Sequence, residues 1–270
     1  RDSFEGYFIF DADNLLKIDD GAFAYCELLD EFNFADGLEY IGSEAFYYSN
    51  IGSAILPESL VYMGEEAFSG SWDLVDVTIP GTLTEIPDGA FSDCALSSIN
   101  IGEGVEVIGE NAFSYNWQLR EISLPDSVVE VRERAFNECE SLVAIELGSG
   151  LKKIGAYAFA NLTALEEVNL PSTIKMIDQG AFYGCTKLTK VNGIENVKFI
   201  NQYAFYGCNL QGEIKLDNAA AIGNYAFGSG AITYYYENKD TGEAGWTTKA
   251  GGTNEFTSVV LSEKTQSIGA

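Results

Sequence analysis

The cysteines and the acidic side chains are the residues of this 270-residue chain that could hold a metal ion or perform catalysis. The chain has no histidine, which removes the commonest metal ligand and the usual general base near neutral pH. No two cysteines form a close C-x-x-C pair, so the spacing of a zinc site is absent as well. Carboxylate pairs such as Glu65-Glu66 could support glycoside hydrolysis, but they occupy exposed positions of a repeat with no predicted cleft. The sequence therefore predicts no catalytic residue, no metal site and no cofactor, and a carboxylate-pair hydrolase is the one enzymatic alternative.

The cysteines share one position, three residues after a phenylalanine. They are Cys26, Cys94, Cys139, Cys185 and Cys208. The equivalent positions elsewhere hold Ser49, Ser71, Asn116, Leu162 and Gly230. A position that accepts these residues favours a small inward-facing side chain, so we expect five inward-facing, unbonded thiols. Only Cys185 and Cys208 fall in adjacent repeat units, so only this pair could approach disulfide distance.

A repeat of 22 or 23 residues runs through most of the chain. If the phenylalanine of each Ala-Phe pair is taken as the origin, ten origins follow one another at this spacing. They are Phe23, Phe46, Phe68, Phe91, Phe113, Phe136, Phe159, Phe182, Phe205 and Phe227. Apolar residues stand five and eight positions before every origin, and a leucine or isoleucine stands seventeen before each origin from the second unit on. Because no unit of this length can bury its apolar side alone, the units must stack and share one core.

Each unit contains a short alternating stretch, such as residues 122–124, that reads as a β-strand. In four units a proline ends this stretch, and proline cannot donate to a continuing ladder. These are Pro57, Pro80, Pro125 and Pro171. The Ala-Phe pair and the residue three further on share one face only if the chain turns helically there. The predicted fold is an α/β repeat solenoid, a leucine-rich repeat stack of about ten units. A continuous parallel sheet of at least eight strands would form one face, and short helical or 3₁₀ turns would form the other.

A glycine-rich column lies four residues before the origin. It contains Gly42, Gly64, Gly109, Gly155 and Gly223, together with Asp19, Asp178 and Asn201. This composition suggests a left-handed backbone. Pro87 and Arg132 share the column, however, and proline excludes positive φ, so a left-handed residue is not required there in every unit.

Four segments follow from where the repeat begins, breaks and ends. Residues 1–20 form a partial, capping repeat that includes a strand-like stretch at 7–14, and residues 21–228 form the solenoid. In residues 229–256 two strand-like stretches flank a turn, which predicts a hairpin that either replaces a repeat or projects from the stack. Residues 257–270 match the start of a further, truncated repeat.

The chain is strongly acidic, with 41 Asp and Glu against 15 Lys and Arg and a net charge of −26. Such a surface repels nucleic acid and anionic membranes, and no apolar run is long enough for a membrane-spanning helix. Between Ile18 and Leu119 there are 19 acidic residues and no basic one. This stretch either serves solubility or provides a docking face for a cationic partner or for calcium.

Strand alternation places the residues fifteen and thirteen before the origin on the outer face of the predicted sheet. The candidate ligand-binding residues on this face are Glu31, Asn33, Asp76, Thr78, Asn100, Glu121, Ser123, Glu146, Glu167 and Asn169. The alternative is that the polar side chains of this face only solvate the sheet. A second candidate is an aromatic edge around Trp72 and Trp117, which both lie four residues after their origin. We expect these tryptophans to pack the turns. The alternative is an exposed pair for a partner, which the nearby tyrosines favour.

The phrase LREISLPDSVVEVRERAFNEC at 119–139 contains all of these columns. It resembles the BspA-like leucine-rich repeats of bacterial surface proteins, also called the Treponema pallidum type, and the resemblance covers about residues 7–228. Two departures stand out toward the end. The stretch 191–199 lacks the proline that usually ends the strand, and a one-residue slip gives Glu213 and Lys215 as the outward residues of the last unit.

The resemblance implies a bacterial protein that is secreted or displayed on the cell surface and that adheres to host proteins or to other cells. It implies no catalytic residues that could be carried over. The expected function is a non-catalytic binding or adhesion module for an unidentified host or cell-surface protein, without nucleic-acid binding and without membrane insertion by this segment. The alternative is a structural spacer that presents another domain at the cell surface.

Overall fold

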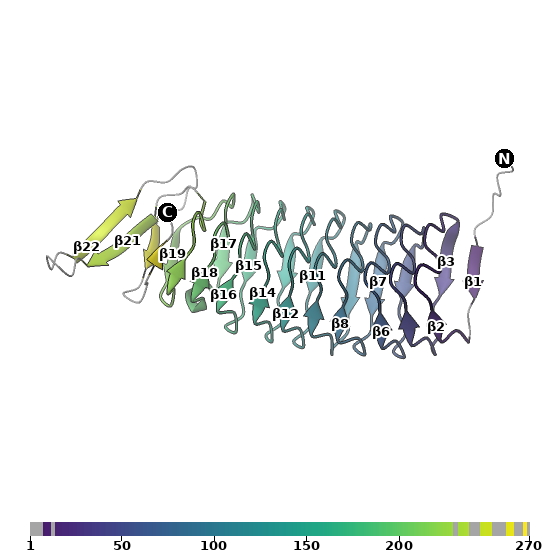
Figure 1. Cartoon of the computed structure of the whole chain (residues 1–270). Coiled ribbons are helices and arrows are strands. Elements are labelled where there is room, and N and C mark those ends of the chain that lie inside the picture. The colour runs from purple at the N-terminus through teal and green to yellow at the C-terminus, as the bar shows by residue number, and fades with distance from the viewer. Residues whose placement is uncertain are drawn as a thin grey trace.

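Each repeat unit forms one coil of a solenoid, and the coils stack in chain order along a single axis (Figure 1). The computed structural model describes residues 8–11, 14–228, 232–237, 244–249, 258–261 and 267–268. Each coil contributes one strand to row A, one strand to row B, and then a turn that contains the Ala-Phe pair and leads back to row A. We call the third side the turn row.

Row A contains the strands that the sequence predicted. They are β1 (Phe8–Asp11), β3 (Leu29–Asn33), β5 (Ser53–Ile55), β7 (Asp76–Ile79), β9 (Ser98–Ile101), β11 (Glu121–Ser123), β13 (Ala144–Glu146), β15 (Glu167–Asn169), β17 (Lys190–Asn192), β19 (Glu213–Leu216) and β23 (Ser258–Leu261). All are parallel, but they form separate sheets of two or three strands: β1-β3, β5-β7-β9, β11-β13, β15-β17 and β19-β23. Three of the four breaks fall beside a unit of 22 residues. Such a unit has one residue fewer than the others between the preceding origin and the leucine or isoleucine that stands seventeen before its own origin.

Row B consists of two-residue strands that end at the apolar column five residues before the origin. They are β2 (Lys17–Ile18), β4 (Tyr40–Ile41), β6 (Tyr62–Met63), β8 (Glu85–Ile86), β10 (Val107–Ile108), β12 (Glu130–Val131), β14 (Lys153–Ile154), β16 (Met176–Ile177), β18 (Phe199–Ile200), β20 (Ala221–Ile222) and β24 (Ser267–Ile268). Eight of them, from β8 to β24, form one continuous sheet. The predicted sheet of at least eight parallel strands therefore exists in row B, and its placement in row A was wrong. Row B keeps one register because its spacing to the origin is the same in every unit.

The one break in row B, between β6 and β8, has a local cause. In most coils the residue after the row B strand donates its N–H to the preceding coil, as Gly64 does to Ile41 (2.9 Å) and Gly109 does to Ile86 (2.8 Å). Pro87 holds that position after β8 and has no N–H, so this rung of the ladder is missing.

The turn row contains no helix within residues 14–228, which corrects the prediction of short helical turns. Instead, the N–H of each origin phenylalanine from Phe23 to Phe205 donates to the alanine carbonyl of the next coil, as from Phe136 to Ala158 at 2.8 Å. The residues two before and two after the origin also donate their N–H groups to the next coil, as Arg134 does to Ala156 and Glu138 does to Ala160. Their backbones have positive φ, 52° at Arg134 and 63° at Glu138. Left-handed residues at these two positions break any helical hydrogen-bond pattern, so the turns form a ladder between coils. The one helix in the described part of the chain is the 3₁₀ helix η1 (Ile194–Asn196), which follows β17.

The origin phenylalanines form a single file through the core. Centroids of successive rings are 4.9 to 5.5 Å apart, and interplanar angles are 2 to 17°. The apolar columns five, eight and seventeen residues before the origin pack around this file, and nearly all of their members are buried. The shared core that the repeat predicted is confirmed.

Close packing explains the glycine column four residues before the origin. None of its glycines has positive φ, so the left-handed interpretation was wrong. A Cβ on Gly155 would lie 2.7 Å from the carbonyl carbon of Arg132, and one on Gly42 would lie 2.4 Å from the backbone nitrogen of Asp20. Glycine is favoured here because neighbouring backbones approach one another too closely for a side chain.

The terminal segments add strands at both ends of the stack. β1 lies within the predicted strand at 7–14 and pairs with β3. β21 (Ile232–Glu237) pairs antiparallel with β22 (Ala244–Lys249), as in the predicted hairpin, whose connecting residues 238–243 lie outside the described residues. β23 then pairs with β19 and β24 with β20, so the chain resumes the stack directly on the preceding coil. No helix in the described part of the chain has the length and apolar character needed to cross a membrane.

Candidate functional site

Row A presents a polar face to solvent. Its strands alternate as predicted: in β11, Glu121 and Ser123 are exposed and Ile122 is buried. All ten residues predicted on this face point away from the core, nine of them exposed and Thr78 partly buried. They are Glu31, Asn33, Asp76, Thr78, Asn100, Glu121, Ser123, Glu146, Glu167 and Asn169.

Toward the C-terminal end of row A, side chains of neighbouring strands form ion pairs and hydrogen bonds with one another. Lys190 Nζ lies 2.8 Å from Glu167 Oε1, and the Asn192 amide donates to the same oxygen at 2.5 Å. Asn192 also donates to Asn169 Oδ1 at 2.6 Å. The hydrogen bonds from Lys190 and Asn192 lower the pKa of Glu167. Glu167 and Asn169 are therefore held in a network between β15 and β17.

Asp76 and Glu121 are not held in this way. Asp76 lies between Ser53 and Ser98 of the neighbouring strands, and Glu121 lies beside Ala144. Neither carboxylate takes part in an ion pair with another described residue. Both are exposed, so a cationic ligand could meet them without first displacing a lysine or arginine.

An aromatic edge borders row A on the side where its strands begin. It consists of Tyr25, Tyr47, Tyr48, Trp72, Tyr115 and Trp117. Trp72 and Trp117 are 61% and 58% exposed, so they stand at the surface and are not packed within the turns. The Trp72 ring lies 5.4 Å from the Tyr48 ring in an edge-to-face arrangement, and its indole N–H donates to Asp93 Oδ2 at 3.3 Å.

The two tryptophans flank a position that carries only a methyl group. Ala95 holds the equivalent place in the coil between them and is buried. Because neighbouring strands are about 4.8 Å apart, the two indoles rise roughly 10 Å from one another. Asp76 and Glu121 follow their tryptophans by four residues, a reach of at most about 13 Å along the chain. Exposed aromatic rings and unpaired carboxylates therefore share one border of row A.

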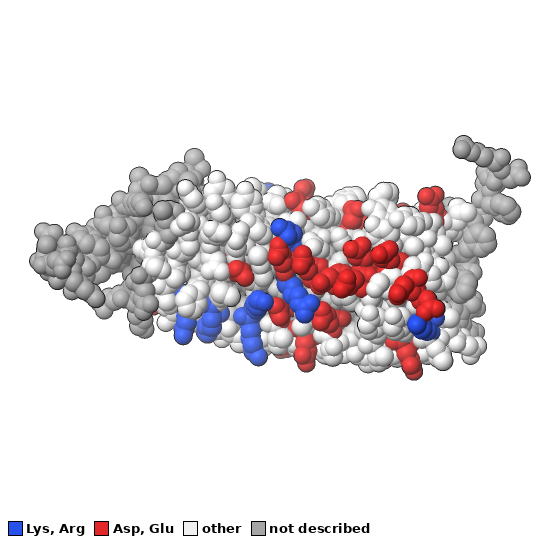
Figure 2. All heavy atoms as spheres, in the orientation of Figure 1, with Lys and Arg blue, Asp and Glu red and all other residues white. Residues whose placement is uncertain are grey.

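Acidic side chains also gather where row B joins the turn row. This acidic band consists of Asp20, Glu44, Glu65, Glu66, Asp88, Glu110 and Glu133. Backbone hydrogen bonds connect its members from coil to coil, as from Glu44 to Glu65 at 2.9 Å. Figure 2 shows acidic residues over the N-terminal half of the drawn face and most lysines and arginines over the other half. No group of three or more described acidic or cysteine side chains could hold a metal ion, so nothing there supports the calcium alternative.

All five cysteines are free thiols, four of them buried and Cys26 partly buried. Their column is more specific than a small apolar side chain, because the thiol donates to the phenylalanine carbonyl of the preceding coil. Cys185 Sγ does so to Phe159 at 3.1 Å, and at the same position Ser71 Oγ donates to Phe46 at 2.8 Å. Burial raises the pKa of Cys139 to about 12, so that thiol is not a nucleophile.

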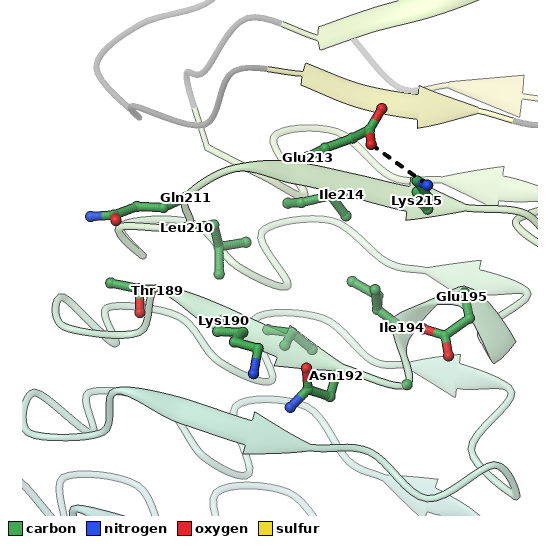
Figure 3. Close-up of a pocket in the computed structure, with 12 residues that line it drawn as sticks. Thr189, Lys190, Asn192, Ile194, Glu195, Leu210, Gln211, Glu213, Ile214 and Lys215 are labelled. Atoms are coloured by element: carbon green, nitrogen blue, oxygen red, sulfur yellow. Dashed lines mark ion pairs between the residues drawn. The ribbon is translucent and has the colours of Figure 1, made fainter.

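Row A opens into a gap between β17 and β19 (Figure 3). At one end, Gln211 N–H donates to the Thr189 carbonyl at 3.0 Å. At the other end, the Asn218 side-chain amide donates to the Glu195 carbonyl at 2.8 Å. Between these contacts β17 pairs only with β15, and β19 pairs only with β23. The space that remains has a volume of about 460 Å³ and is open to solvent.

The gap arises where the sequence departs from the repeat. Gly193 and η1 follow β17 in place of the usual proline turn. Gly193 has φ 80, and a Cβ there would lie 2.3 Å from the carbonyl oxygen of Leu170, so only glycine fits. On the other side, β19 belongs to a 22-residue unit and begins one residue out of step with β17.

The gap has an apolar floor and a polar rim. The floor consists of the buried side chains of Ile194, Leu210 and Ile214. The rim carries Lys190, Asn192, Glu195, Gln211, Glu213 and Lys215. In Figure 3 these side chains come from both walls, and the Glu213 carboxylate lies 3.7 Å from Lys215 Nζ. Sequence reasoning placed Glu213 and Lys215 on the outer face but missed the gap itself. Two features of the sequence could have indicated the gap: the stretch 191–199 lacks the proline, and the next strand is shifted by one residue in the repeat.

Comparison with known proteins is consistent with this architecture. A profile of the "BspA type Leucine rich repeat region" matches the chain in six copies, over residues 7–120 and 107–233. A search of curated proteins gave no significant match.

Among the solved structures that are similar to this chain are two with TM-scores above 0.5. The leucine-rich repeat protein TpLRR of T. pallidum is 29% identical over 58% of this chain and 76% of its own, with a TM-score of 0.54. A leucine-rich repeat protein from Eubacterium ventriosum ATCC 27560 is 19% identical over 80% of this chain and 74% of its own, with a TM-score of 0.53. The second likeness shows the fold alone.

Proposed function

The chain belongs to the BspA-type leucine-rich repeat family of bacterial surface proteins, and we propose on that premise that it is a non-catalytic binding module. Secreted or displayed at the bacterial surface, it would adhere to a protein of a host or of another cell. The binding surface would be the outer face of row A together with the aromatic edge. No catalysis and no cofactor enter this proposal.

The exposed tryptophans are the observation that carries it. Nothing in the fold requires a large aromatic residue four positions after the origin. The other coils hold Glu27, Asn50, Ala95, Glu140, Thr163, Thr186 and Asn209 at that position. Trp72 and Trp117 nevertheless leave more than half of their surface in water. Tryptophan is the residue type most enriched at the energetic centres of protein interfaces, so a partner protein is the best account of this exposure.

The surroundings of the tryptophans favour a partner segment that carries lysine or arginine. Asp76 and Glu121 lie nearby and form no ion pair with another residue that the structure describes, and Asp93 accepts a hydrogen bond from Trp72. A cation above an indole ring gains about 0.5–2 kcal/mol from the ring quadrupole, and nearby carboxylates add to that attraction. The expected contact is thus a basic side chain inserted between the two indoles.

The test is retention of a partner by immobilised protein. Wild-type chain and the double variant Trp72→Ala/Trp117→Ala are incubated with an extracellular-matrix extract or with intact host cells. The matched control is Tyr62→Ala/Phe199→Ala, which removes two rings that are 46% and 44% exposed on row B. We expect the tryptophan variant to lose at least about tenfold in affinity, as for a pair of interface hot spots, and the control to bind like wild type. Equal binding by all three proteins would place the interface elsewhere.

A structural spacer is the second candidate function, favoured by the stiffness that an unbroken phenylalanine file gives to the stack. A spacer would retain no partner in the same experiment. It would also tolerate both tryptophan substitutions without any change in what the bacterial surface binds.

A further inference from the structure

We propose that the gap between β17 and β19 binds an extended peptide segment of a partner protein as an added β-strand. This site differs from the aromatic edge in place and in chemistry. It stands on the local geometry of the gap and does not depend on the tryptophans.

The walls of the gap are two strand edges that face one another. Like the strands at the other three breaks in row A, β17 and β19 each pair on one side only among the described residues, and here a space of about 460 Å³ lies between them. A strand edge offers backbone N–H and C=O groups at regular intervals, which is what an incoming peptide needs in order to add a strand. The contacts Gln211–Thr189 and Asn218–Glu195 close both ends and so set the length. Since β17 has three residues and β19 has four, the bound segment would be three to four residues long.

The size and floor of the gap suit such a segment. Its volume of about 460 Å³ lies within the usual range of roughly 300–1,000 Å³ for ligand sites. Successive side chains of a strand point to opposite faces, so alternate peptide residues would meet the apolar floor of Ile194, Leu210 and Ile214. None of the described residues that line the gap is aromatic, so a flat sugar or nucleobase ring would find no aromatic side chain among them on which to stack.

The charge of the rim sets this site apart from the rest of the chain. Lys190 and Lys215 balance Glu195 and Glu213, so the rim is neutral within a chain of net charge −26. Lys190 Nζ also forms an ion pair with Glu167 Oε1 at 2.8 Å, so its charge is already compensated. The gap thus admits a neutral or mixed-charge peptide, whereas the aromatic edge favours a basic one.

The test uses a phage-displayed library of random peptides as the probe. The library is selected on wild-type protein and counter-selected on Asn192→Trp, in which the indole would fill the gap from the β17 wall. Synthetic copies of the selected peptides are then titrated by fluorescence anisotropy. We expect affinity for Asn192→Trp to fall by at least about tenfold, as when a strand-addition groove is blocked.

A matched control separates the gap from the general surface of row A. Ser123→Trp places the same side chain at the same position of the repeat, on β11 and outside the gap, and should bind like wild type. Trp72→Ala/Trp117→Ala should also bind like wild type, so failure of this proposal and failure of the proposed function are distinguishable. If Asn192→Trp does not fold, Lys215→Trp fills the gap from the opposite wall, where the lysine side chain is 64% exposed.

Strand addition has a signature that a simple pocket lacks. Methylation of any backbone nitrogen of the three to four bound residues should weaken binding, because successive N–H groups point to opposite sides and the gap has a strand edge on each side. Methylation of peptide residues outside this segment should be tolerated. The proposal is overturned if no selected peptide discriminates wild type from both gap-filling variants. Tolerance of methylation at every position, or an oligosaccharide that binds in the gap instead, would also overturn it.

Discussion

At the scale of single residues, the position three after the origin, which holds the five cysteines, shows how a buried carbonyl favours a side chain that can donate a hydrogen bond. The turn leaves the phenylalanine carbonyl inside the stack, where a suitable residue three positions after the next origin can donate to it. Cysteine, serine and asparagine all do so, as in Cys94 to Phe68 (3.1 Å) and Asn116 to Phe91 (2.8 Å). Composition alone suggested a small hydrophobe, because cysteine is counted among apolar residues and its weak donor is easily overlooked.

Replacing Cys185 by valine should destabilise the fold more than replacing Cys139 by valine. The Phe159 carbonyl accepts from Cys185, and Leu162 in its own coil cannot donate a side-chain hydrogen bond. The Phe113 carbonyl keeps a second donor, the Asn116 amide at 2.9 Å, after Cys139 is changed. We expect a difference of about 1–3 kcal/mol in the free energy of unfolding, the cost of orphaning a buried acceptor.

Urea denaturation of the two variants measures this difference. Cys185→Ser should unfold like wild type, because serine donates at the same position in the coil of Ser71. If both valine variants lost the same free energy of unfolding, the shape of the side chain, and not its hydrogen bond, would determine which residues are accepted at this position.

Alkaline pH should destabilise the protein through its buried thiols. Burial raises the pKa of Cys139 to about 12, above the value of about 8.5 for an unfolded cysteine. The unfolded chain therefore loses this proton first, so stability is full below about pH 8.5 and falls as pH rises toward the folded pKa. The slope is about 1.4 kcal/mol per pH unit for each such thiol.

Denaturation midpoints at pH 7 and pH 10 check this expectation. Cys139→Ser removes the titrating group, so the loss of stability between pH 7 and pH 10 should be smaller by the contribution of one thiol. A variant that keeps the full wild-type sensitivity would mean that this thiol ionises normally in the folded state.

At the scale of elements, the phenylalanine file couples each coil to its neighbours. Phe136 has ring centroids 5.2 Å from Phe113 and 5.5 Å from Phe159, and it is fully buried. Truncating Phe136 to alanine should cost about 3–5 kcal/mol, as for other buried aromatic residues. Hydrogen exchange should accelerate in the coils on both sides as well, because stability in a repeat stack is shared between neighbours. Exchange confined to one coil, or a loss below about 1 kcal/mol, would contradict this coupling.

The glycine column gives a second test at this scale. A Cβ on Gly155 would lie 2.7 Å from the Arg132 carbonyl carbon, whereas a Cβ on Gly37 would meet only Leu16 Cδ2 at 3.5 Å. Neither glycine has positive φ, so the two substitutions by alanine differ in space alone. Gly155→Ala should cost about 1–3 kcal/mol through overpacking, and Gly37→Ala should cost much less. Thermal unfolding of the two variants measures the difference. If both variants lost similar stability, close contact between neighbouring coils could not explain the glycines four residues before the origin.

The sequence predicts the period, the core columns and the outward positions because each of these depends on side-chain type. The turns could not be predicted in the same way. Their left-handed positions hold residues such as Arg134 and Tyr157, which give no compositional signal for positive φ. The two-residue strands of row B are likewise too short for alternation to show. The gap beside β17 follows from two neighbouring coils in combination, so no single unit reveals it.

At the scale of the whole molecule, charge is unevenly distributed along the solenoid. The acidic residues between Ile18 and Leu119 occupy the N-terminal half, and the two tryptophans lie on those same coils. Most of the basic residues on the drawn face lie over the C-terminal half (Figure 2). A cationic partner approaching the molecule would therefore be drawn toward the half that carries the aromatic edge.

This field should appear in the rate of association of the partner retained by the wild-type chain. Attraction between exposed charges is screened over about 8 Å at physiological ionic strength, so binding should weaken steeply as salt rises. Asp76→Asn/Glu121→Gln should slow association several-fold and leave dissociation and folding nearly unchanged, because long-range charge mainly steers encounter.

The control is Glu65→Gln/Glu110→Gln, which removes the same charge from the acidic band where row B joins the turn row. It should slow association less, since those carboxylates lie away from row A. Stopped-flow or surface-binding kinetics at several salt concentrations separate the two rates. If neither pair alters association and salt has no effect, the acidity serves solubility alone, and the tryptophans must hold the partner through apolar contact.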